Sequence, residues 1–248
     1  MNTIDVSQKS AVMTITLNNP DKGNALSDAM VGEINDALDS ADKSADDGDV
    51  ALVIFQSAGK HFCTGFDLSD LADVNDDVLL SRLIRIEMLL ARVWSARYVT
   101  LAMAKGRTFG AGADLLAACD RRFGQVGASF SFPGAAFGLV LGSRRLGQRI
   151  GLDVAQEVIL SGRRLSDAES RDLGLLSGIV DGQEAIDTLL EAEALTAKRL
   201  AEVTRVQLRQ VLGDSQADLD ADLGNLVRSA VRPGLKKRIE DYRAQMVA

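Results

Sequence analysis

Residues 105–120, with the sequence KGRTFGAGADLLAACD, constrain the fold more than any other part of the chain. A strand-like apolar run, Val99–Ala104, leads into them, and their second half is typical of a compact apolar helix. Three glycines, Gly106, Gly110 and Gly112, permit a positive φ and a close approach of the backbone to a neighbour. A helix that begins at such a turn presents unpaired N–H groups, so we expect the chemistry of the protein here.

Asp114 lies in the first turn of the helix that this stretch predicts. The residues that follow, 115–118, are apolar on every side, which predicts a buried helix rather than an amphipathic surface helix. A carboxylate at this place is either a helix-start residue, stabilised by the helix dipole, or a working acid/base group. From this stretch alone the helix-start interpretation is slightly favoured.

Helices and strands alternate along the first half of the chain, which predicts an α/β fold. Segments 4–6 and 11–17 form an expected N-terminal hairpin, because apolar and polar residues alternate in the second of them. Ser27 is suited to cap a helix that ends near a glycine, Gly48. The continuous apolar run at 50–55 predicts a strand buried on both faces, and residues 78–94 predict a long helix.

The second half of the chain predicts short strands after Asp120 and then an irregular, largely apolar segment at 133–142 that could roof a pocket. Helices are expected at 143–150 and 153–160, and Ser166 with Glu169 predicts a capping box. A short strand at 175–180 precedes a chain that is helical and charged from Gly182 to its end.

A second glycine loop, residues 57–68, follows the strand at 50–55, and α/β folds usually bind ligands beyond the end of a strand. Two loops that each offer backbone N–H groups suit the stabilisation of a developing oxyanion. The Gly110-Ala111-Gly112 turn does not complete the dinucleotide fingerprint GxGxxG. A serine hydrolase is also disfavoured, because no GxSxG motif occurs and His61 is the single histidine.

The net charge of −7 argues against nucleic acid or an anionic membrane as a partner and favours a small-molecule ligand. Arg144, Arg145 and Arg149 could still form a local basic patch. The 248 residues suffice for one domain with a sizeable core. No apolar run is long enough to span a bilayer, and one histidine excludes a metal site built from several histidines, so we expect no metal.

The two cysteines, Cys63 and Cys119, favour a reduced environment, and the first residues do not resemble a signal peptide. We therefore expect a cytoplasmic protein. Cys119, at the end of an apolar helix, is expected to be a core residue.

HFCTGFDL at 61–68 and KGRTFGAGADLLAACD at 105–120 resemble the two signature loops of the enoyl-CoA hydratase/isomerase (crotonase) superfamily. The similarity extends to NNPDKGNALS at 18–27 and to the RRLSDAESRDLGLLSGIV stretch. It implies an α/β fold, a spiral of ββα units at 1–190 with a helical oligomerisation region at 191–248. It also implies an acyl-CoA substrate, coenzyme A being part of the substrate with no further cofactor, and assembly as a homotrimer or hexamer.

By this resemblance the thioester oxygen is held by the backbone N–H groups of Phe66 and Ala111. His61 and Cys63 fall on positions without a chemical role in the family and are expected to be packed loop residues. The resemblance further predicts contacts with coenzyme A, mostly through the backbone, at Lys22, Asn24, Ala25, Cys63, Gly65, Asp67 and Leu68.

The chain departs from the family where hydratases carry two glutamates, because these positions hold Asp114 and Gly134. The shorter side chain draws the carboxyl back by roughly 1.5 Å, and the second acid/base group is missing. Isomerisation of a double bond needs one proton shuttle, for which Asp114 suffices. Thioester hydrolysis or decarboxylation by the oxyanion hole, with Arg144 or Arg145 holding a substrate carboxylate, stays open, although surface placement of these arginines is favoured. A non-catalytic acyl-CoA-binding assembly subunit is the alternative from another class.

Overall fold

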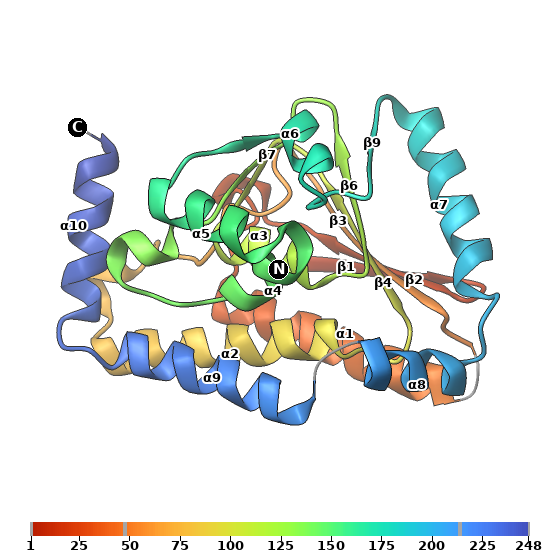
Figure 1. Cartoon of the computed structure of the whole chain (residues 1–248), viewed down its shortest axis with the longest axis horizontal. Helices are drawn as coiled ribbons and strands as arrows, with labels where there is room; N and C mark the ends of the chain where they lie inside the picture. The colour runs from red at the N-terminus through yellow and green to blue at the C-terminus, as the bar shows by residue number, and fades with distance from the viewer. Residues whose placement is uncertain (1, 47–48, 213–214, 248) are drawn as a thin grey trace.

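The computed structural model describes residues 2–46, 49–212 and 215–247. Within these residues a six-stranded sheet has the order β1-β2-β3-β4-β6-β9, in which every neighbouring pair except β1–β2 is parallel (Figure 1). A second sheet has the order β5-β7-β8. The strands are β1 (Ile4–Lys9), β2 (Val12–Leu17), β3 (Leu52–Ser57), β4 (Val99–Ala104), β5 (Arg107–Phe109), β6 (Arg121–Gln125), β7 (Ser129–Ser131), β8 (Leu165–Ser166) and β9 (Gly178–Val180).

The predicted N-terminal hairpin is present as β1 and β2, with Ile4 opposite Leu17. It is longer than predicted, because β1 continues through exposed polar residues to Lys9 and the chain turns at Ser10, whose φ is +51°. Ladder hydrogen bonds use backbone groups, so the polar side chains of this edge strand do not end the pairing. The predicted strand at 50–55 begins two residues late, because Ala51 and Leu52 both donate to the carbonyl oxygen of Ala11.

The predicted helices of the first two thirds of the chain are present, and their caps follow from the sequence in part. Ser27 Oγ accepts a hydrogen bond from Met30 N–H, and Ser166 Oγ accepts one from Glu169 N–H, as expected. Among the described residues the other half of the predicted capping box is not formed, because the Glu169 carboxylate pairs with Arg163 at 2.5 Å. The predicted stop at Gly48 lies outside the described residues. These helices are α1 (Asp28–Asp46), α2 (Asp76–Trp94), α3 (Ala111–Ala118), α4 (Ser143–Ile150), α5 (Leu152–Ser161) and α6 (Asp167–Asp172).

The core lies between the main sheet and helices α1 to α5. All residues of α3 are buried, which confirms the prediction made for this helix from its apolar surroundings in the sequence. β5 was not predicted. It is three residues long, and it exists because Gly106–Phe109 turns away from β4 to pair with β7 in the second sheet.

The chain is helical after β9, as predicted, with α7 (Gln183–Ala197), α8 (Glu202–Leu212), α9 (Gln216–Ala230) and α10 (Leu235–Val247). The expected boundary at residue 190 falls inside α7. Helix α9 runs beside α2, and a separate apolar cluster joins Leu79 and Leu83 of α2 to Leu226, Leu235 and Ile239 (Figure 1). None of the described helices is long and apolar enough to cross a membrane.

Candidate active site

A cavity of about 620 Å³ lies where the two glycine loops meet. Gly65, Phe66, Gly110 and Ala111 form one side of it. The segment at 133–142, which includes the short 3₁₀ helix Pro133–Phe137, lines it as the sequence predicted, and α10 contributes Ile239 and Tyr242. The lining is mostly apolar, as in many sites for small organic ligands.

The two loops approach each other so closely that they require glycine. A Cβ on Gly112 would lie 2.5 Å from the carbonyl oxygen of Cys63, and Gly65 has a φ of +107° with its Cα against Gly110. The loops are tied together by Phe109 N–H, which donates to Cys63 O at 2.9 Å. This contact holds the backbone of residues 65–66 next to the first residues of α3.

Phe66 and Ala111 line the cavity from the two loops. Within the described chain neither backbone N–H donates a hydrogen bond to protein. Ala111 is the first residue of α3, so its N–H has no partner inside the helix. Leu26 N–H donates to Gly65 O and Asp67 N–H donates to Leu26 O, so the intervening Phe66 N–H points the other way. Two unused backbone donors therefore belong to one cavity.

Asp114 also lines the cavity, one turn into α3, and is 5% exposed. Its Oδ1 is buried without a hydrogen-bond partner among the described residues. Burial raises the pKa of the Asp114 carboxyl well above its ordinary value, and the nearby Glu87 raises it further, whereas Arg145 lowers it. Asp114 lies in the first turn of α3, as the helix-start interpretation requires, but within the described residues no side-chain hydrogen bond caps this helix.

Gly142 fixes the place of the Asp114 side chain. Its φ is +65°, and a Cβ there would lie 2.1 Å from Asp114 Oδ1. Gly134, where the sequence comparison with hydratases expects a glutamate, lines the cavity from the opposite segment and brings no carboxyl group. Asp114 is therefore the sole carboxyl group among the described residues that line the cavity.

Of the two arginines of α4 for which surface placement was favoured, Arg145 is buried, whereas the Arg144 side chain is 28% exposed. Arg145 is fully buried and donates to Glu87 of α2 at 2.5 and 3.2 Å, and Arg144 donates to Asp222 of α9 at 2.8 and 2.6 Å. Arg149 donates to the carbonyl oxygens at 117 and 119 and lies over the Trp94 ring. The local basic patch that the sequence left possible is therefore not formed by these residues. Helix α4 packs against buried neighbours, so each guanidinium has a partner inside the protein.

Of the residues expected to contact coenzyme A, Gly65 and Leu68 line the cavity. Lys22 contacts the residues on either side of Leu68, with its Nζ 2.8 Å from Ser69 Oγ and 3.4 Å from Asp67 Oδ2. Ala25 is buried next to this loop, and Leu26 N–H donates to Gly65 O.

Asn24 and Cys63 serve the scaffold of the loops through their polar groups. The Asn24 amide nitrogen donates to the carbonyl oxygens of Ala58 and His61, and its oxygen accepts from Asn19 N–H. Cys63 is buried, and burial raises the pKa of its thiol to about 12. The predicted contacts of these two residues with coenzyme A, through the backbone, stay a prediction.

His61 and Cys119 have the packed roles that the sequence predicted. His61 Nδ1 accepts a hydrogen bond from Arg107 N–H at 3.1 Å, and burial, with Arg107 and Lys60, lowers the pKa of the imidazole. Cys119 is buried in the core, and burial raises the pKa of its thiol. Both cysteines are free thiols.

The sequence analysis missed three arginines and a tyrosine of the cavity, Arg107, Arg164, Arg243 and Tyr242. Arg164 lies over the Phe109 ring at 5.2 Å from its centroid. The Tyr242 ring packs on Phe137 at 5.3 Å, and Arg243 donates to Leu68 O at 3.4 Å. They come from β5, from the residues before β8 and from α10, so no local pattern in the sequence groups them.

Comparison with known proteins decides the family of this chain. Residues 7–232 match the sequence model of the enoyl-CoA hydratase/isomerase family. The chain belongs to the enoyl-CoA hydratase/isomerase family. A crystal structure of an enoyl-CoA hydratase/isomerase from Bordetella parapertussis is 41% identical, with a TM-score of 0.94 over 99% of this chain and 100% of that chain. The family match confirms the resemblance to the crotonase superfamily. The likeness to this crystal structure confirms the predicted α/β class.

Two curated relatives in the family carry different names. The peroxisomal Delta(3,5)-Delta(2,4)-dienoyl-CoA isomerase of Arabidopsis thaliana is 32% identical over 193 residues, which cover 72% of this chain and 68% of that protein. The mitochondrial enoyl-CoA hydratase domain-containing protein 2 of Mus musculus is 29% identical over 219 residues, 86% of this chain and 73% of that protein. Family membership therefore leaves the reaction to be inferred from the site.

Proposed function

We propose that this protein isomerises a double bond in an enoyl-CoA thioester, with Asp114 as the sole acid/base group. The observation that carries the proposal is the single carboxyl group in the cavity lining, which is buried and has an unpaired Oδ1. Membership of the enoyl-CoA hydratase/isomerase family supports an acyl-CoA substrate. The name of the Arabidopsis relative, a dienoyl-CoA isomerase, supports the choice of isomerisation.

In the proposed mechanism the thioester oxygen accepts hydrogen bonds from the N–H groups of Phe66 and Ala111. The ionised Asp114 removes a proton from one carbon of the acyl chain, and the electron pair moves through the double bond onto the thioester oxygen. The two N–H groups stabilise this enolate, because rigid donors aimed at one oxygen need no reorganisation. Asp114 then returns the proton to another carbon, so the double bond moves and no atom is gained or lost.

Hydration would require more than this cavity offers. One group has to activate the water and another has to protonate the carbon, and Gly134 provides no second carboxyl group opposite Asp114. Thioester hydrolysis and decarboxylation rely mainly on the oxyanion donors, so they stay as alternatives. A protein that binds acyl-CoA without turning it over is the alternative from another class.

The lining supports an apolar acyl group. The apolar side chains of Phe132, Phe137, Leu139 and Ile239 line the cavity. Among the described lining residues no cation is buried, so none is placed to bind the carboxylate of a substrate inside the cavity. Coenzyme A is proposed to bind at the loop side, where Lys22, Asn24, Ala25, Cys63, Gly65, Asp67 and Leu68 are gathered. The arginines at the cavity, Arg107, Arg164 and Arg243, suit its phosphate groups. No cofactor other than this part of the substrate is proposed.

The test compares wild type with Asp114→Asn on short enoyl-CoA isomers, measuring isomerisation, hydration and thioester hydrolysis side by side. We expect isomerisation by wild type and a loss of roughly 10²- to 10⁴-fold in the variant, the usual contribution of a general base. The amide is nearly isosteric, so the melting temperature and coenzyme A binding serve as controls for the fold. Isomerisation that survives in Asp114→Asn would contradict the proposal, and binding without any turnover would favour the non-catalytic alternative.

A further inference from the structure

Four charged side chains outside the cavity lining form one connected group: Glu87 of α2, Arg144 and Arg145 of α4, and Asp222 of α9. Of these, Glu87 and Arg145 lie close enough to Asp114 to act on its charge. Glu87 and Arg145 are 1% and 0% exposed and share two hydrogen bonds. Asp222 Oδ2 lies 2.6 Å from Arg144 and 3.4 Å from Arg145. A buried ion pair such as Glu87–Arg145 adds little stability compared with apolar residues of the same volume. Stability alone therefore does not explain why this pair is present near the site.

The Glu87–Arg145 pair borders Asp114 through two elements. Leu83, one turn before Glu87 on the same face of α2, lines the cavity together with Asp114. Gly142, whose backbone abuts Asp114 Oδ1, is the residue from which α4 begins, and Arg145 lies in the first turn of this helix. Helix α3 packs against both α2 and α4, and the Glu87–Arg145 hydrogen bonds join α2 to α4. The pair therefore lies at the closed side of the Asp114 carboxyl.

The charges of this group cancel. With both carboxyl groups ionised, two carboxylates and two guanidinium groups leave no net charge in this group, because arginine is always protonated in proteins. Burial raises the pKa of the Glu87 carboxyl, and its hydrogen bonds with Arg145 oppose this shift. An ionised Asp114 would thus face the Glu87 carboxylate in a site of low dielectric, with no donor on its Oδ1. The other charged lining residues are Arg107, Arg164 and Arg243, and none of them is a hydrogen-bond partner of Asp114.

We propose that Glu87, held in place by Arg145, is a positioning residue that puts a negative charge at the closed side of Asp114 and so favours the neutral carboxyl in the ligand-free site. Arg145 attracts an Asp114 anion, and Glu87 cancels this attraction. Without the carboxylate of Glu87 the group behind Asp114 carries a net positive charge, and the Asp114 anion becomes more favourable. The consequence for turnover rests on the proposed function, in which only the ionised Asp114 removes the first proton.

The experiment uses Glu87→Gln, which keeps the shape of the side chain and one acceptor for Arg145. The matched control is Asp42→Asn, because Asp42 of α1 accepts from Arg92 of α2 at 2.7 Å and lies outside the cavity lining. The Asp114 carboxyl is followed directly in ligand-free protein by infrared spectroscopy. Its C=O band is identified as the band that Asp114→Asn removes.

We expect the Asp114 band to titrate at a lower pH in Glu87→Gln than in wild type and to be unchanged in Asp42→Asn. On the acid limb of the pH–rate profile the isomerisation rate of Glu87→Gln should rise roughly tenfold over wild type, because a larger fraction of Asp114 is ionised at each pH. A merely structural Glu87 would lower the rate at every pH and leave the titration in place. An unchanged titration in a folded Glu87→Gln overturns the inference.

Asp222→Asn tests the same inference should Glu87→Gln not fold. It removes a negative charge 3.4 Å from Arg145 at the edge of the group, so the Asp114 titration should move in the same direction by a smaller amount. No movement would overturn the inference. The spectroscopic readout needs no turnover, so a titration that moves while the pH–rate profile stays fixed supports the role of Glu87 and contradicts Asp114 as the acid/base group.

Discussion

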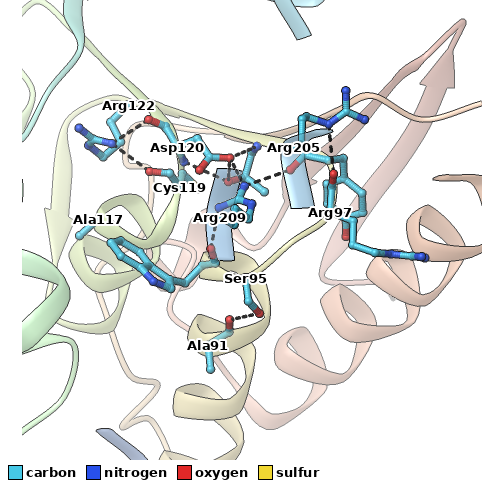
Figure 2. Close-up of polar contacts among 12 residues, drawn as sticks. Ala91, Ser95, Arg97, Ala117, Cys119, Asp120, Arg122, Arg205 and Arg209 are labelled. Atoms are coloured by element: carbon cyan, nitrogen blue, oxygen red, sulfur yellow. Dashed lines mark hydrogen bonds and ion pairs between the residues drawn. The ribbon is translucent and has the colours of Figure 1, made fainter. Parts of the chain in front are cut away.

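Arginines are used in two different ways in this molecule, beside the cavity and under helix α8. Beside the cavity, Arg145 is fully buried and its charge is balanced by Glu87. Under α8, Arg205 and Arg209 are part-buried and donate mainly to backbone carbonyl oxygens, as Figure 2 shows. Arg209 also pairs with Asp120 at 2.6 Å. The first arrangement sets the charge around a reactive group, and the second fastens a helix to the body of the protein.

The second arrangement explains how α8 is held although none of its residues is buried. Arg205 Nε donates to Arg97 O, and Arg209 donates to Trp94 O at the end of α2. Such donors satisfy carbonyl groups that a helix or turn leaves unpaired at its end. The apolar residues of α8 are then free to point outward, and Val211 and Leu212 are 79% and 80% exposed.

The largest difference between the two regions should appear when the arginine is removed. Arg145→Met leaves Glu87 buried without a partner and should lower the free energy of unfolding by about 3–5 kcal/mol. The double variant Glu87→Leu/Arg145→Met should recover most of this loss, because two apolar side chains replace a buried pair of charges. Urea denaturation of both variants measures the effect. Equal losses in the single and the double variant would show that packing volume, not charge, governs this site.

The raised pKa of Asp114 should also make the stability of the folded protein depend on pH. Its raised pKa means that the folded state holds a proton which the unfolded chain has lost, so the unfolded state binds fewer protons. Stability therefore falls as pH rises from the ordinary aspartate range near 4 to the raised folded value, by at most about 1.4 kcal/mol per pH unit. Asp114→Asn should remove this slope, measured by denaturation at several pH values. A slope unchanged in the variant would assign it to other groups.

Within the cavity region, the glycine loops and the charged pair behind Asp114 differ in how far the sequence predicts them. The glycine loops and the buried helix α3 could be predicted, because Gly110, Gly112 and the apolar residues after Asp114 act over a few neighbouring positions. The Glu87–Arg145 pair could not, because its members are 58 residues apart and lie in stretches that look like solvent-exposed helix. Only the packing of α2, α3 and α4 brings them together.

Removing an arginine under α8 should cost less than removing Arg145. Arg209→Met loses bonds to Trp94 O, Tyr98 O and Asp120, but the side chain is 26% exposed and water can replace it. We expect a loss of about 1 kcal/mol, confined to α8. Hydrogen exchange should show faster opening of α8 amides with little change in the sheet. A global loss as large as that of Arg145→Met would contradict the proposed contrast between the two regions.

The smallest effect on stability is expected for Val211→Glu, on the outward face of α8. Val211 is 79% exposed, so the change should alter unfolding of a single chain by less than about 0.5 kcal/mol. The family resemblance implies a homotrimer or hexamer, and apolar side chains such as Val203, Val211 and Leu212 suit contact with another copy. If α8 lies in that contact, sedimentation should show wild type as an oligomer and Val211→Glu shifted toward smaller species. A wild-type monomer at micromolar concentration would contradict the assembly, and an oligomer indifferent to Val211→Glu would place its interface elsewhere.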